Sequence, residues 1–163
     1  MRRAARSIAV VLALAVTIGA ASAAMAQAAR WRVMAEMGTA PDFALLLIDV
    51  LTLTSPTRNT RTLTVANYRT TMIPVPGGEP YNLVRITYAF DCTARTTQRV
   101  RVLVYADGRL LSGGPTEGEV IPVKAGTLPG DLFEPACSGD FDAFAPIAEA
   151  TPEAERDKRF GLR

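Results

Sequence analysis

The sequence has 163 residues, with 18 Lys and Arg against 16 Asp and Glu, and 48% of its residues are hydrophobic. It contains two cysteines and no histidine. The absence of histidine excludes Ser–His and Cys–His dyads, histidine general bases and most zinc or copper sites. Neither a P-loop nor a dinucleotide-binding glycine motif occurs in it. We therefore expect no cofactor and no metal.

Residues 1–26 have the pattern of a secretory signal peptide. Three arginines precede an apolar run at residues 8–18, and Ala24-Met25-Ala26 is a cleavage motif. Cleavage after Ala23 and retention of the segment as a membrane anchor are the alternatives. Cleavage predicts a periplasmic or secreted protein, without a membrane span, in a compartment where disulfides persist.

Removal of this segment changes the charge of the protein. Without its three arginines, 15 basic residues remain against 16 acidic ones. Nucleic-acid binding needs a concentrated basic surface, so the near-neutral chain argues against it. The remaining 137 residues are enough for a single core but not for two.

The first half of this domain predicts strands separated by turns. Residues 31–37 alternate like an edge strand, and residues 61–71 are rich in threonine and β-branched side chains. Residues 43–53 are so rich in Leu and Ile that they predict a central strand covered on both faces. Asp49 interrupts that run and is expected to mark where the strand emerges into solvent. Glycine, proline and asparagine predict turns or loops at residues 38–42, 55–59 and 73–80.

Residues 83–105 predict a β-hairpin, because two runs of side chains alternate with period two. If both apolar sets face one core, the numbers of paired residues sum to an even number. A sum of 190 leaves a three-residue loop at residues 94–96 and places Asp91 opposite Arg99. Sums of 188 and 192 are the alternatives.

The segment after the hairpin predicts two more strands and a helix. Asp107-Gly108 is a hairpin turn, residues 112–118 are a polar turn, and residues 119–123 resemble a short final strand. Residues 127–137 predict a short helix that begins at Thr127 and has proline in its first turn. From residue 138 onward the composition shifts to Ala, Pro, Glu and Arg. We therefore expect residues 138–163 to form a poorly ordered tail.

Cys92 ends the first strand of the hairpin, facing inward, and Cys137 lies in the predicted helix. A disulfide between them closes a loop of about 45 residues and contributes roughly 4 kcal/mol on the chain-entropy model. Two buried free thiols are the alternative. The predicted fold is α+β and mainly β: a single antiparallel sheet of about six strands, with a short C-terminal helix tethered by the disulfide. The predicted domain comprises residues 27–137.

Several short motifs resemble the surface-adhesin E-like family of small exported bacterial proteins. They are Trp31, Leu47-Ile48-Asp49, Phe90-Asp91-Cys92, Tyr105-x-x-Gly108, and Gly126-Thr127 leading through Leu132 to Cys137. The resemblance implies an antiparallel sheet with a disulfide-held helix, a location in the cell envelope and, for some members, adhesion to host molecules. The chain departs from the family pattern at Glu119-Val120, where an aromatic residue is expected, and at Ala125, where a proline is expected. It also lacks the lipid-anchoring cysteine of surface-attached relatives.

The outward face of the hairpin is the candidate partner-binding surface for a protein or a polyanion. It comprises Arg85, Arg99, Arg101 and Tyr105, with Arg95 at the turn. A solvated sheet face is the alternative. We therefore expect an exported, non-enzymatic envelope protein that binds a macromolecular partner. A structural or accessory periplasmic protein that self-associates through a sheet edge is the alternative, ahead of a carboxylate enzyme.

Overall fold

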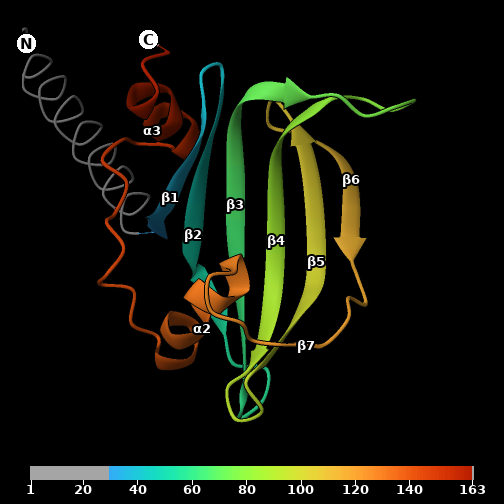
Figure 1. Cartoon of the computed structure of the whole chain (residues 1–163), viewed down its shortest axis with the longest axis vertical. Helices are drawn as coiled ribbons and strands as arrows, with labels where there is room; N and C mark the ends of the chain where they lie inside the picture. The colour runs from blue at the N-terminus through green and yellow to red at the C-terminus, as the bar shows by residue number, and fades with distance from the viewer. Residues whose placement is uncertain (1–29, 163) are drawn as a thin grey trace, which may run out of the picture.

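The computed structural model describes residues 30–162, so the predicted signal peptide lies outside the described residues. Within them, seven strands and two helices follow one another in the order shown in Figure 1. The strands are β1 (Trp31–Thr39), β2 (Asp42–Thr54), β3 (Thr60–Ile73), β4 (Tyr81–Asp91), β5 (Thr96–Ala106), β6 (Arg109–Pro115) and β7 (Ile121–Pro122). The helices are α2 (Leu128–Ser138) and α3 (Pro152–Arg159).

The sheet is an antiparallel meander. Strands β1 to β6 lie in sequence order, and β7 pairs with the opposite end of β5 from the β5–β6 turn. The predicted mainly β fold with an antiparallel sheet is confirmed. Two boundaries differ from the prediction. Residues 112–115, predicted in a turn, continue β6, and only residues 121–122 of the predicted final strand pair with the sheet.

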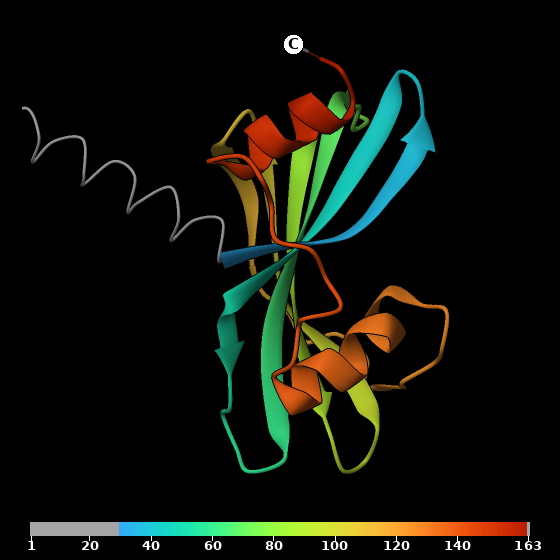
Figure 2. The same ribbon diagram turned by 90° about the vertical axis from the view of Figure 1, so that its left-hand side faces the viewer.

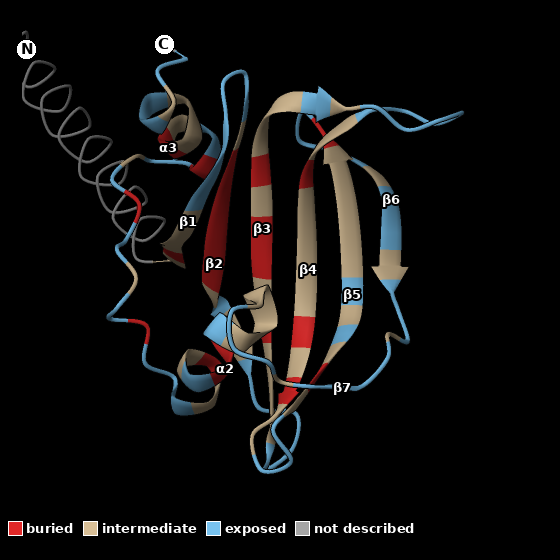
Figure 3. Cartoon of the chain, in the orientation of Figure 1, coloured by how far each residue is buried: buried red, intermediate tan, exposed pale blue. Residues whose placement is uncertain are grey.

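Strand β2 is covered on both faces, as its unbroken apolar run predicts. Leu45 and Leu47 point into a cluster that contains Trp31 and Tyr68, whereas Ile48 points into a cluster on the other face. Each fully buried aliphatic side chain contributes roughly 1.5–3 kcal/mol. In Figure 3 the middle of β2 is buried along its length, while much of β6 is exposed. The sheet therefore separates two small cores.

The two helices lie on opposite faces of the twisted sheet (Figure 2). Helix α2 packs on the face of Ile48, Leu63 and Phe90, which we call the α2 face. Helix α3 and Ile147 pack on the face of Leu45, Leu47 and Tyr68, which we call the α3 face.

Helix α2 begins and is fixed as its sequence predicts. The side chain of Thr127 accepts a hydrogen bond from the Gly130 N–H at 3.2 Å, which satisfies one donor of the first turn. Its inner side buries Leu132, Phe133 and Ala136 against the α2 face. Cys137 forms the predicted disulfide with Cys92. The tether thus joins the end of α2 to the end of β4.

Residues 139–162, where the sequence predicts a poorly ordered tail, pack against the sheet. Phe141 and Ile147 are buried, and the chain runs along β1, where the Val33 N–H donates to the Ala145 carbonyl at 2.7 Å. Helix α3 follows and packs on β2 and β3. Composition misses this packing because only isolated apolar residues of the segment are buried. Charged side chains make many of the remaining contacts.

The β4–β5 register differs from the predicted one. From Leu83↔Tyr105 to Thr87↔Arg101 the paired residue numbers sum to 188, one of the two alternatives. Beyond a β-bulge, Tyr88 pairs with Arg99. The turn has four residues, 92–95, and Asp91 lies opposite Thr96 rather than Arg99. The Asp91 carboxylate instead accepts hydrogen bonds from the backbone N–H groups of Thr93 and Ala94 in the turn. The predicted Asp91–Arg99 pair is therefore wrong.

The prediction that Asp49 emerges into solvent is wrong. Asp49 is only 2% exposed. Its carboxylate accepts two hydrogen bonds from the Arg30 guanidinium, one of them at 2.8 Å from Nε. Arg30 directly precedes β1, whose Trp31 pairs with Asp49. A buried carboxylate requires such a partner, and the neighbouring strand supplies it.

Candidate partner-binding surfaces

The β-bulge in β5 divides the predicted binding residues between the two faces of the sheet. Cross-strand partners point to the same side of an antiparallel pair. Pairings with β4 place Arg85, Arg101 and Tyr105 on the α3 face. Arg99 pairs with Tyr88 and therefore lies on the α2 face. The prediction that all four share one face is wrong, because Val100 is an extra residue between Arg99 and Arg101.

On the α3 face, Arg85 is held among aromatic rings. Its guanidinium carbon lies 5.6 Å from the ring centroid of Trp31 and 5.4 Å from that of Tyr105. One guanidinium nitrogen donates to the Tyr68 hydroxyl at 3.2 Å. Such cation–π contacts contribute roughly 0.5–2 kcal/mol each. We call these four residues the arginine–aromatic cluster.

At the arginine–aromatic cluster, the neighbouring Arg30 is paired with an acidic side chain, whereas Arg85 is not paired with one among residues 30–162. Arg30 also lies over Trp31, at 5.0 Å, but its charge is paired with Asp49, and the hydrogen bond to that carboxylate raises the pKa of Arg30. Burial raises the pKa of Tyr68, and the charge of Arg85 partly opposes this rise. Within residues 30–162, neither Arg85 nor the exposed Arg101 forms an ion pair. Arg85 and Arg101 therefore supply positive charge at this part of the α3 face.

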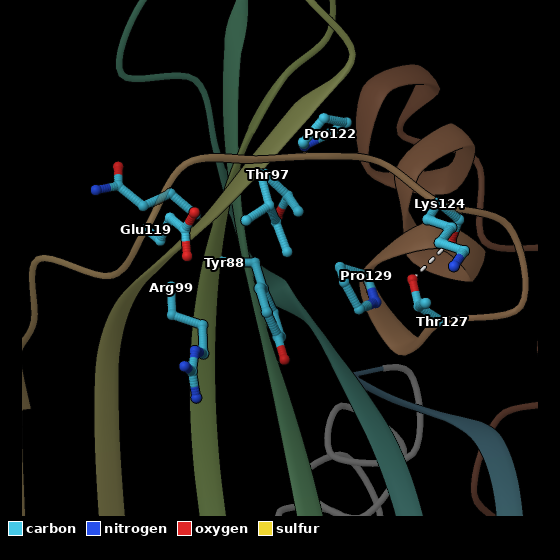
Figure 4. A pocket seen from close by; sticks show the side chains of 10 residues that line it. Tyr88, Thr97, Arg99, Glu119, Pro122, Lys124, Thr127 and Pro129 are labelled. Carbon is cyan, nitrogen blue, oxygen red and sulfur yellow. Dashed lines mark hydrogen bonds between the residues drawn. The ribbon is translucent and has the colours of Figure 1, made fainter.

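On the α2 face, Arg99 lies at an open cavity of about 540 Å³ (Figure 4). The sheet contributes Tyr88, Thr97 and Arg99 to its lining, the segment after β7 contributes Lys124, and the first turn of α2 contributes Pro129. Burial raises the pKa of Tyr88, and the charge of Arg99 opposes this rise. The cavity thus combines an aromatic ring with two cationic side chains.

Two further residues complete the description of these surfaces. Thr97 is only 2% exposed, and its hydroxyl has no hydrogen-bond partner among residues 30–162. Arg95 lies over the ring of Phe133 and forms an ion pair with Glu134 at 3.0 Å. It therefore contacts α2 and joins neither the arginine–aromatic cluster nor the cavity lining.

Sequence reasoning missed the residues that come to these sites from distant segments. Trp31 and Tyr68 reach Arg85 across four neighbouring strands, and Lys124 reaches the cavity through a crossover. One signal was available in the glycine-rich stretch before β7. A Cβ atom at Gly118 would lie 2.7 Å from the Arg99 carbonyl oxygen, so glycine there indicates close approach to β5.

Within the described part of the chain, no cluster of residues is suited to hold a metal ion, and no helix is long and apolar enough to cross a membrane. No curated protein matches the chain in a sequence search. The family model of surface-adhesin protein E matches residues 31–138, which run from the start of β1 to the end of α2. This match covers the sheet, the disulfide and the tethered helix, and confirms the resemblance predicted from the motifs. The chain belongs to the surface-adhesin protein E family.

Proposed function

We propose that this chain is an exported, non-enzymatic protein of the cell envelope that binds an acidic macromolecular partner through its α3 face. The family to which it belongs supports an adhesin-like role at the surface. The observation that carries the choice of surface is Arg85, which is held between two aromatic rings close to the exposed Arg101. Arg85 forms no ion pair with any acidic residue of the described range 30–162.

The geometry suits recognition of carboxylate or sulfate groups. A guanidinium fixed by stacking loses little side-chain entropy when it binds an anion, and its planar donors match such groups. Arg101 lies on the next strand, opposite Thr87, and its side chain is free to contact a larger partner. Tyr105 adds apolar contact area. The two arginines thus supply charge, and the rings supply a rigid support.

Binding to immobilised heparin over a series of salt concentrations tests this proposal. Arg101→Glu is expected to weaken binding about tenfold or more, because it replaces attraction by repulsion at the surface. Arg58→Glu is the matched control, since it changes the net charge equally in the exposed β2–β3 turn. If both variants lose the same affinity, binding depends only on net charge and the proposed surface is wrong.

Self-association through a sheet edge is the second candidate function. Residues 145–147 cover part of the outer edge of β1, through an Arg32↔Pro146 bridge and two backbone hydrogen bonds. Among the described strands, β6 pairs only with β5, so its outer edge is open. Dimers that form with increasing concentration and persist in Arg101→Glu, measured by analytical ultracentrifugation, would favour this function.

A further inference from the structure

We propose that the cavity on the α2 face is a second binding site, which takes a small carboxylate that carries an apolar ring. This inference goes beyond the proposed function, because the cavity lies on the opposite face of the sheet from the arginine–aromatic cluster. Its volume of about 540 Å³ falls in the range of pockets that hold small molecules.

The bulge and the loop after β6 build one wall of this site together. The extra residue Val100 turns Arg99 toward the α2 face, and the displaced backbone is satisfied by the loop. The Arg99 carbonyl accepts from the Gly118 N–H at 3.1 Å, and the Val100 carbonyl accepts from the Thr116 N–H at 2.9 Å. The Gln98 amide donates to the Gly118 carbonyl at 2.7 Å. Bulges that re-aim a side chain are common beside functional sites.

The opposite wall is fixed by the start of α2. The Lys124 carbonyl accepts a hydrogen bond from the Thr127 hydroxyl at 2.6 Å. Gly130 packs so closely that a Cβ atom there would lie 2.0 Å from the same oxygen. The Val123 N–H donates to the Arg95 carbonyl at 2.9 Å. Both walls are therefore held by hydrogen bonds to the backbone and by close packing of glycine.

The charges of the lining favour a single negative charge on the ligand. Arg99 and Lys124 are cationic, and Glu119 is the one acidic residue among the lining side chains. None of the three forms an ion pair within residues 30–162. A monoanion would balance the remaining positive charge, and a carboxylate matches the donor geometry of a guanidinium.

The uncharged side chains favour a ring beside the carboxylate. As seen in Figure 4, Tyr88 lies between Arg99 and Pro129, so an apolar face adjoins a cation. A planar or puckered ring can stack on Tyr88 and on a proline. Thr97 lines the same cavity, and its buried hydroxyl has no hydrogen-bond partner in the described part of the chain. A polar atom of the ligand can supply that partner.

Titration of the protein with N-acetylphenylalanine, followed by calorimetry and by ¹H–¹⁵N NMR, tests the proposal. N-acetylphenylalanine amide lacks the charge, and N-acetylalanine lacks the ring. We expect the acid to shift the backbone signals of Thr97, Arg99 and Lys124. Each truncated probe is expected to bind at least about fivefold more weakly.

Variants distinguish a site from general attraction of the acid to exposed basic side chains. Arg99→Gln and Lys124→Gln are each expected to weaken binding of the acid about five- to tenfold, whereas the control Arg58→Gln leaves it unchanged. Equal loss in all three variants, no binding of the acid, or shifts confined to the α3 face would overturn the proposal. The probe is a small molecule, so these outcomes leave heparin binding at Arg101 untouched.

Discussion

At the scale of single residues, the buried carboxylate of Asp49 depends on one partner, Arg30. Its residue is 2% exposed, and the carboxylate accepts both of its side-chain hydrogen bonds from Arg30. Asp49→Asn is expected to lower the free energy of unfolding by about 2–3 kcal/mol, since it leaves Arg30 unpaired at a partly exposed site. Chemical denaturation of Asp49→Asn, Arg30→Gln and the double variant measures the coupling. Fully additive losses would contradict the ion pair.

Thr97 is a cavity residue whose hydroxyl is not expected to stabilise the fold. Its buried hydroxyl has no hydrogen-bond partner among the residues that the structure describes, and such a group costs about 1–3 kcal/mol when it is left unsatisfied. Thr97→Val keeps the shape of the side chain, so we expect the free energy of unfolding to stay unchanged or to rise by about 1 kcal/mol. Thermal and urea unfolding measure this effect. A loss of more than about 1 kcal/mol would mean that the hydroxyl is satisfied in the fold.

The residue scale also shows why the candidate site was only partly predictable from the sequence. Alternation identified Arg85, Arg101 and Tyr105 as sharing a face, and the structure agrees. Arg99 was assigned wrongly because nothing in the β5 sequence marks Val100 as a bulge. The hydrogen bonds that satisfy the bulge come from residues 116 and 118, well beyond the strand. Because these hydrogen bonds come from outside β5, the bulge leaves no pattern in the sequence of the strand itself.

At the scale of elements, the disulfide holds α2 to the sheet. The bond closes a loop with a sequence separation of 45 residues. Reduction is expected to lower the free energy of unfolding by up to about 4 kcal/mol. Urea unfolding with and without a reductant measures the loss. The Cys92→Ala/Cys137→Ala variant is the control and should be insensitive to the reductant. A difference below about 1 kcal/mol would contradict a stabilising tether.

Helix α3 is held to the chain before it by Glu155. This side chain accepts hydrogen bonds from the backbone N–H groups of residues 148 and 149 and from Arg159. Burial alone would raise the pKa of Glu155, but these hydrogen bonds outweigh it and hold the pKa below its ordinary value of 4.5. The folded state therefore favours the charged form.

The consequence is a loss of stability in acid. Because the pKa of Glu155 is lower in the folded than in the unfolded chain, its contribution is complete above about pH 4.5 and is lost as the pH falls through the lowered value. Glu155→Gln is expected to flatten this part of the curve of unfolding free energy against pH. Glu153→Gln, on the exposed side of the same helix, is the control. Equal curves for the wild type and Glu155→Gln would contradict this role.

The elements of the sheet follow from the sequence more closely than those of the C-terminal segment. Runs of β-branched and aliphatic residues and the Asp107-Gly108 turn locate β2 to β5 within a few residues. Residues 139–162 carry no comparable periodic pattern, because β1 supplies most of the backbone partners of residues 145–147. Ile147 is buried singly in a core built by other strands. Such packing cannot be inferred from composition.

At the scale of the whole molecule, one sheet supports two separate cores and two separate candidate surfaces. Helix α2, its disulfide and Phe141 cover part of one face, and α3 with Ile147 covers part of the other. The uncovered parts hold the arginine–aromatic cluster with Arg101 on the α3 face and the cavity on the α2 face. The single bulge in β5 assigns its arginines to different surfaces, so the two sites are expected to bind independently.

The most direct test of this division is an NMR comparison of two ligands on the same protein. A heparin oligosaccharide is expected to shift the signals of Arg85, Arg101 and Tyr105, and N-acetylphenylalanine those of Thr97, Arg99 and Lys124. Neither ligand should change the affinity of the other by more than about twofold. A single shared set of shifted residues, or displacement of one ligand by the other, would contradict the account.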